Sequence, residues 1–120
     1  MMRSVVFLAL LAASPAQAAN VEAGKAVFHR CQICHSVAPD GPEKPGPSLH
    51  GVFGRKAGTY DDFHFSAAMK ASGIVWNDAT LAKYIRDPKE FVPGNNMAFP
   101  GITDKAKIAE LLAYLKEATK

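Results

Sequence analysis

The sequence is organised around the pentapeptide Cys31-Gln32-Ile33-Cys34-His35, which has the C-x-x-C-H spacing of a c-type haem attachment site. Two thiols three residues apart on a helical turn lie on the same side of the backbone, where both can form thioethers with the two vinyl groups of one porphyrin. The histidine that follows then lies under the ring, where its imidazole can bind the iron. The stretch therefore predicts one covalent haem c, with His35 as an axial ligand.

The same C-x-x-C pair also occurs in zinc sites, in thioredoxin-like redox sites and in simple disulfides. A zinc site needs two further ligands at matched spacing, but the chain has only two cysteines and no H-x3–5-H pair follows the motif. A thioredoxin-like site needs a strand that leads into the motif within an alternating β/α pattern, whereas residues 21–30 are predicted to be helical. The spacing therefore favours haem attachment, which the rest of the chain has to support.

The start of the chain, residues 1–18, is predicted to be a signal peptide rather than part of the fold. Arg3 provides the positive start, residues 5–13 are apolar, and Ala16-Gln17-Ala18 has the small-residue pattern of a cleavage site. The alternative, a retained membrane anchor, is disfavoured because nine apolar residues are too few to cross a hydrocarbon core of roughly 30 Å. The mature chain, residues 19–120, is then one exported domain of 102 residues, which we expect in the periplasm.

The remaining pattern predicts an all-α fold of about four to five helices with long loops. The clearest helix ends the chain, where apolar residues recur at i, i+3, i+4 and i+7 and form one face: Ile108, Leu111, Leu112 and Leu115. Capping residues mark where the helices begin. We expect helices at residues 21–30 after Asn20, at 66–72, at 78–86 after Asn77, at Pro88 after Asp87, and from the cap Thr103 to about residue 119.

Residues 36–58 form an unusually irregular segment, in which nine of 23 residues are Gly or Pro. No helical or strand period survives there, and the segment stays irregular to about Phe65. A structureless loop of this length is unusual in a compact small domain. It is expected if the loop wraps a large rigid ligand that supplies part of the missing core, and a haem fits that role.

A haem iron held by His35 takes a second axial ligand, for which Met and His are the usual candidates in electron carriers. Only Met69 and Met97 remain after removal of the leader. Met97 lies between Pro93-Gly94 and Pro100-Gly101, so we expect it outside any helix, where it is not a core gap-filler. Met69 lies in a short helical run, where core packing is expected. We therefore predict Met97 as the iron ligand, and surface positions for His29, His50 and His64.

Together these motifs resemble class I cytochrome c, in particular the mitochondrial protein and its small bacterial relatives of the c-two type. The likeness covers nearly all of the mature chain, in order and in spacing. It is carried by CQICH at 31–35, GPSLHG at 46–51, FGRK at 53–56, Trp76, YI at 84–85, DP at 87–88, PG at 93–94 and MAF at 97–99. The resemblance implies the single-haem cytochrome c fold, one covalent haem c, and an electron carrier rather than an enzyme.

The resemblance also implies roles for residues around the haem. The Pro47 carbonyl would accept a hydrogen bond from His35 and fix the imidazole. Trp76 would donate a hydrogen bond to one haem propionate, with Arg55 as its charged companion. Asn95 stands where the family often has a threonine near the other propionate.

Further positions either follow or depart from the family pattern. Tyr84 is similar to the phenol that lies beside the methionine sulfur, and Gly24 and Phe28 resemble the first-helix residues that cross the last helix. Phe65 stands where the family commonly has a tyrosine that donates to a propionate, so that donor is missing. Met69 stands where a polar residue, often asparagine, is common. Both departures concern the haem pocket, and neither concerns the ligands.

By the same resemblance, the protein is a periplasmic carrier of single electrons between a cytochrome bc complex and a terminal oxidase or a photosynthetic reaction centre. We expect a monomer with no transmembrane segment once the leader is removed. Without Arg3 the chain has 13 Lys and Arg against 11 Asp and Glu, which is not a nucleic-acid-binding composition. Two alternatives stay open, a peroxidase-like haem enzyme with an open sixth position and a haem-storage module. Partners are expected at a basic face near the haem edge, with the candidates Arg30, Lys44, Lys89 and Lys105.

Overall fold

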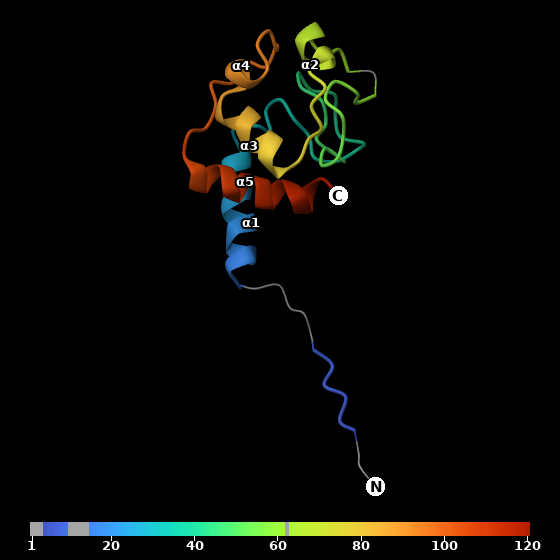
Figure 1. Cartoon of the computed structure of the whole chain (residues 1–120), viewed down its shortest axis with the longest axis vertical. Coiled ribbons are helices and arrows are strands. Elements are labelled where there is room, and N and C mark those ends of the chain that lie inside the picture. The colour runs from blue at the N-terminus through green and yellow to red at the C-terminus, as the bar shows by residue number, and fades with distance from the viewer. Residues whose placement is uncertain (1–3, 10–14, 62) are drawn as a thin grey trace.

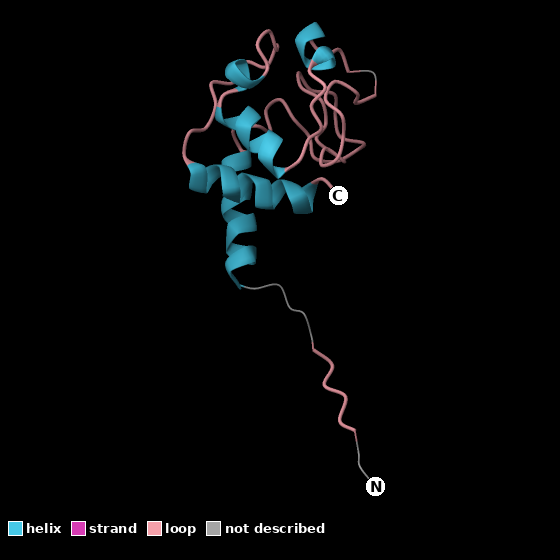
Figure 2. Ribbon diagram, in the orientation of Figure 1, coloured by secondary structure: helices cyan, strands magenta, loops and turns pink. Residues whose placement is uncertain are grey.

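The computed structural model describes residues 4–9, 15–61 and 63–120, and that part of the chain is helical (Figures 1 and 2). Within it, five helices follow one another: α1 Pro15–Phe28, α2 Ala67–Ala71, α3 Asp78–Arg86, α4 Pro88–Phe91 and α5 Lys105–Ala118. The strand-like pairing in these ranges is one isolated antiparallel bridge between Lys56 and Val75. The all-α prediction is therefore confirmed.

The predicted leader, residues 1–18, lies only partly in the described ranges, because residues 1–3 and 10–14 are outside them. Residues 4–9 carry no regular structure and are exposed to solvent. The last residues of the predicted leader form the start of α1. Of the helices described here, none combines the length and the apolar character that crossing a bilayer requires.

Helices α1 and α5 cross closely because α1 has a glycine where the two backbones meet (Figure 1). A Cβ atom at Gly24 would overlap the backbone carbonyl of Glu110 and would lie 2.7 Å from Cβ of Tyr114. One turn later, the rings of Phe28 and Tyr114 pack with their centroids 5.3 Å apart. The crossing expected for Gly24 and Phe28 is confirmed. It fixes the end of α1 that leads into the C-x-x-C-H motif.

Helices α3 and α4 begin at the caps that the sequence predicts. The Asn77 side chain accepts a hydrogen bond from the Thr80 backbone N–H, and the Thr80 hydroxyl accepts one from the Asn77 N–H, each at 2.9 Å. Asp87 accepts from the Glu90 N–H at 3.2 Å, with Pro88 at the first helical position. Asp87 also ends α3, so one residue separates the two helices. The chain after α4 then returns to α3, where the Ile102 N–H donates to the Ile85 carbonyl at 2.9 Å.

Two other predicted caps are wrong. Asn20 lies inside α1, because the alanine-rich residues before it favour helix and extend α1 back to Pro15. The cap of α5 is Asp104 rather than Thr103. The Asp104 carboxylate accepts from two N–H groups of the first turn, at 2.9 and 3.3 Å. A negative charge at this position also interacts favourably with the helix dipole.

The core consists of two apolar clusters. The first joins α1 to α5 and consists of Val27, Phe28, Ile102, Ile108, Leu111 and Leu115. The second joins the long loop to α2, α3 and the end of α4, and consists of Val52, Ala57, Met69, Trp76, Leu81, Tyr84 and Val92. Met69 is 8% exposed, so the core position predicted for it is confirmed. Met97 packs against the second cluster, which places that cluster next to the candidate haem ligand.

Candidate haem site

The C-x-x-C-H motif forms a tight turn directly after α1. The Cys31 N–H donates to the Phe28 carbonyl at 2.7 Å, and the His35 N–H donates to the Cys31 carbonyl at 2.8 Å. Cys31 is half-buried and Cys34 is exposed, and both are free thiols. Burial raises the pKa of the Cys31 thiol, while the Arg30 charge lowers it. The turn therefore presents two unpaired thiols and one imidazole from five consecutive residues.

The His35 imidazole has a fixed orientation. Its Nδ1 lies 2.7 Å from the Pro47 carbonyl oxygen, which can only accept a hydrogen bond, so Nδ1 carries the proton. The other ring nitrogen, Nε2, is then the one with a free lone pair. Burial lowers the pKa of His35, the bond to Pro47 raises it, and the charge of Lys44 lowers it. A neutral imidazole with its second nitrogen held in this way is the form that binds a metal.

The loop that follows the motif folds back onto it. The Gly46 N–H donates to the Cys34 carbonyl at 2.8 Å. The Lys44 amine donates to the Gln32 carbonyl at 2.6 Å and to the His35 carbonyl at 3.4 Å. These bonds close residues 36–47 over the turn and place the Pro47 carbonyl beside the imidazole. The Gly- and Pro-rich segment therefore holds the motif through backbone groups of Gly46 and Pro47 and through the Lys44 side chain.

On the side of the second cluster, Trp76 and Arg55 are joined through their backbones. The Trp76 N–H donates to the Arg55 carbonyl at 2.9 Å. The Trp76 ring packs against Tyr84, with the centroids 5.2 Å apart. Among the described residues, neither the Trp76 indole N–H nor the Tyr84 hydroxyl donates a hydrogen bond to another residue. Both donors are thus available to another group, although each residue is at most 9% exposed.

Arg55 lies beside this pair, and its position is held by neighbouring groups. Its guanidinium donates to the His50 carbonyl and lies 4.5 Å above the centroid of the Tyr60 ring. Burial lowers the pKa of Arg55, while Tyr60 and Asp61 raise it, and an arginine remains charged under such conditions. A fixed cation and an N–H donor, from two residues whose backbones are hydrogen-bonded, are groups that can bind a carboxylate.

Met97 and Asn95 lie in the loop that follows α4. Met97 is half-buried, lies outside any helix as predicted, and packs against the second cluster. The Asn95 side chain is occupied by backbone groups. It donates to the carbonyls of Pro88 and Val92 and accepts from the Met97 N–H. The sequence did not predict these three bonds, because they depend on how the turn at Pro93-Gly94 folds back.

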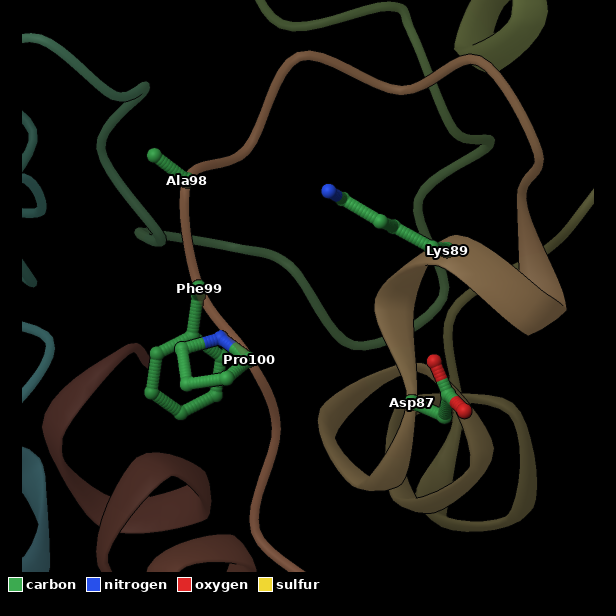
Figure 3. A pocket seen from close by; sticks show the side chains of 5 residues that line it. All are labelled: Asp87, Lys89, Ala98, Phe99 and Pro100. Carbon is green, nitrogen blue, oxygen red and sulfur yellow. The ribbon is translucent and has the colours of Figure 1, made fainter.

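A hollow of about 270 Å³ lies beside the same loop (Figure 3). In Figure 3 the Lys89 side chain extends from α4 toward the segment that carries Ala98. Phe99 and Pro100 follow on that same segment and line the hollow across from α4. A second hollow, of about 470 Å³, lies between residues 36–48 and residues 60, 61, 63 and 64. Within the described ranges, no three His, Cys, Asp or Glu side chains gather as a zinc site would require.

The residues present fit a covalent haem c. Two free thiols and an oriented imidazole come from one turn, and a half-buried methionine comes from a loop outside any helix. Gly46 supports the fit, because a Cβ atom there would lie 2.6 Å from Cε1 of the His35 ring. The sequence predicted the thiols, the imidazole and the methionine. It did not predict the contacts that Gly46 and Lys44 make with the turn, because these arise only when the loop closes.

Comparison with known proteins identifies the same family. The cytochrome c family model matches residues 21–119. The chain is 46% identical over 119 residues to cytochrome c2 of Blastochloris viridis, covering 97% of this chain and 94% of that protein. It is 43% identical over 101 residues to cytochrome c-550 of Nitrobacter winogradskyi, covering 84% and 93%. Among solved structures, cytochrome cH from Methylobacterium extorquens matches with a TM-score of 0.76 and 43% identity, covering 81% of this chain and 97% of that chain.

Proposed function

The chain belongs to the cytochrome c family, whose members carry covalent haem c and transfer electrons, and we propose that it does so in the periplasm with His35 and Met97 as the two iron ligands. The haem supplies a one-electron change between ferrous and ferric iron. The observation that carries this proposal is the 2.7 Å bond between His35 Nδ1 and the Pro47 carbonyl, which leaves Nε2 as the nitrogen that could bind the iron. No bound substrate is part of the proposed reaction.

Export is proposed from the leader. Residues 1–18 have the charge, the apolar run and the A-x-A ending of a signal peptide. The family match begins at residue 21, two residues after the proposed start of the mature chain at residue 19. We therefore propose that residues 19–120 form the mature periplasmic domain. Cleavage after Ala18 would remove residues 15–18, which form the first turn of α1.

The protein residues have separate tasks in the proposed mechanism. Cys31 and Cys34 anchor the ring covalently, so it cannot dissociate during turnover. The Met97 thioether is a soft ligand, and such a ligand favours ferrous iron and raises the potential. Trp76 and Tyr84 exclude water from the second cluster, which disfavours the extra positive charge of the ferric state.

The propionates are assigned to the donors described above. Trp76 supplies its unpaired indole N–H, and Arg55 supplies a fixed positive charge held by His50 and Tyr60. Tyr84 remains a neutral phenol, because burial raises its pKa to about 12. Its hydroxyl is then a hydrogen-bond donor over the physiological pH range, and the family resemblance implies that it would lie beside the methionine ligand.

The proposed partners are a cytochrome bc complex as donor and a terminal oxidase or photosynthetic reaction centre as acceptor. Arg30, Lys89 and Lys105 are exposed and are the proposed contacts. Lys44 contributes less than the sequence suggested, because its amine is bonded to the Gln32 carbonyl. Charged contacts of this kind increase the rate of encounter with an acidic partner.

The test uses the purified holoprotein with purified membrane complexes. We expect a quinol-supplied cytochrome bc complex to reduce it, and an oxidase to oxidise it again, each with saturable kinetics. A peroxidase assay with hydrogen peroxide and an organic dye is run in parallel and should show little turnover. The electron-carrier proposal fails if neither type of complex exchanges electrons with the protein while peroxide turnover is fast.

A further inference from the structure

Asn95 connects the loop of the proposed methionine ligand to the helix before it. The residue follows the turn at Pro93-Gly94 and precedes Met97 by two positions. Its Nδ2 donates to the Pro88 carbonyl at 2.8 Å and to the Val92 carbonyl at 2.9 Å. Its Oδ1 accepts from the Met97 backbone N–H at 2.9 Å. One half-buried side chain therefore contacts both ends of α4 and the backbone of the ligand residue.

The orientation of the Asn95 amide follows from its partners. Two of them are carbonyl oxygens, which can only accept, and the third is an N–H, which can only donate. Reversing the amide would place an oxygen against two oxygens and an NH2 group against an N–H. Both N–H donors of the side chain are consequently in use. Neither N–H is left to bind a haem propionate while these bonds persist.

Few other bonds restrain this loop. Among the described residues, five hydrogen bonds involve residues 93–99, and three of them are made by the Asn95 side chain. The other two are short-range backbone bonds, from Asn95 to Val92 and from Phe99 to Met97. The neighbouring Asn96 is exposed and makes no side-chain bond within the described ranges. The restraint is therefore concentrated in one of two adjacent asparagines.

We propose that Asn95 is a positioning residue that clamps the Met97 loop onto α4 and thereby limits how often Met97 leaves the iron. The inference rests on the proposed His/Met ligation. In it, the stability of the Met97–iron bond depends on a residue that does not itself touch the iron. Loss of the clamp leaves the buried carbonyls of Pro88 and Val92 each with one partner fewer and frees the Met97 N–H. Opening of the loop then competes with fewer bonds, and the open state becomes more populated.

The test measures how fast imidazole binds to the ferric holoprotein, because imidazole can bind only after Met97 has left. At saturating imidazole the rate reports loop opening. Asn95→Ala removes all three bonds and should raise that rate on the order of tenfold or more. Asn95→Asp is nearly isosteric, keeps the acceptor for Met97 and loses both donors, so it should also raise the rate. Asn96→Ala is the matched control and should behave as the parent protein.

The absorption band of the methionine–ferric bond is recorded for each protein before imidazole is added. The proposal is overturned if Asn95→Ala binds imidazole at the parent rate, or if Asn96→Ala accelerates binding equally. It is also overturned if Asn95→Ala changes only the reduction potential, because that result indicates a propionate contact instead of a clamp. If Asn95→Ala fails to take up haem, the rate of imidazole binding to Asn95→Asp decides: a raised rate supports the clamp, and the parent rate overturns it. A parent protein without the methionine band overturns the ligation itself, which is a separate outcome.

Discussion

Gly46 and His35 are in such close contact that no side chain fits between them. A Cβ atom at Gly46 would lie 2.6 Å from Cε1 of the imidazole and 2.8 Å from the Cys34 carbonyl oxygen. The glycine therefore allows its own N–H to reach that carbonyl and allows Pro47 to reach Nδ1. The contact links the irregular loop to the orientation of the proposed iron ligand.

Gly46→Ala should tilt the His35 ring and weaken the fold. The inserted methyl group meets backbone and ring atoms that have little room to move, and overpacking of this kind costs about 1–3 kcal/mol. Denaturant unfolding of the holoprotein measures the loss. Gly54→Ala is the control, since it has no neighbour within 4 Å but has a φ of +88°. It should cost stability through backbone strain and leave the haem spectrum unchanged.

Gly24→Ala should destabilise the crossing of α1 and α5. Alanine gains about 1 kcal/mol of helix propensity over glycine, but its Cβ would overlap the Glu110 carbonyl, so the steric cost is larger. We expect a net loss of about 1 kcal/mol or more in the free energy of unfolding. Shortening Tyr114 to alanine in the same chain should not restore stability, because the nearest atom belongs to the backbone of Glu110. An unchanged or raised stability in Gly24→Ala would show that the crossing is not this close.

Tyr84 should make stability depend on pH in the alkaline range. Burial raises its pKa from 10.0 to about 12 in the folded protein. Between these two values the unfolded chain has already lost the phenol proton and the folded chain has kept it, so unfolding releases a proton. The contribution is fully present below pH 10 and is lost as pH rises toward 12, by at most about 2–3 kcal/mol. Unfolding of the ferrous protein across this range measures it, and Tyr84→Phe should lack this component.

Lys89→Glu should slow electron transfer to an acidic partner complex several-fold at low ionic strength. The side chain is exposed beside the hollow next to the Met97 loop (Figure 3). Added salt should remove most of the difference, because screening acts over about 8–10 Å, and the reduction potential should change little. Stopped-flow kinetics at two salt concentrations measure the effect.

Lys107→Glu on α5 is the control for that experiment. Lys107 is exposed, whereas Lys116 on the same helix is 2.5 Å from Asp78 and its reversal would also break an ion pair. The control should slow transfer less than Lys89→Glu does. Equal slowing by both variants, or slowing that salt does not relieve, would remove the support for a docking surface near Lys89.

Sequence reasoning succeeded where a role follows from local spacing. The apolar period of α5 and the caps Asn77 and Asp87 appear in the structure. The bond between Pro47 and His35 appears as well, but it was implied by the family resemblance and not by spacing. Sequence reasoning failed where adjacent residues offer similar chemistry: Asp104 caps α5 in place of Thr103, since its carboxylate is the stronger acceptor at a helix N-terminus.

Other features depend on how a loop closes, and periodicity does not encode that. The Lys44 amine meets the Gln32 carbonyl only after residues 36–47 fold back. Asn95 reaches Pro88 and Val92 only because the turn before it reverses the chain. The sequence resemblance suggested a propionate role for Asn95, while its hydrogen bonds indicate contacts to the backbone. The structure therefore added most to the account of polar side chains in loops, because it shows which backbone groups they bind.

The visible spectrum of the oxidised holoprotein tests the central proposal, that Met97 is the second iron ligand, most directly. A methionine sulfur on ferric iron gives a weak band near the red edge of the spectrum. Met69→Leu conserves the volume of a core residue and should keep this band, as in the parent protein. Met97→Ala should lose the band and show a lower reduction potential. If Met97→Ala keeps both the band and the parent potential, Met97 is not the ligand.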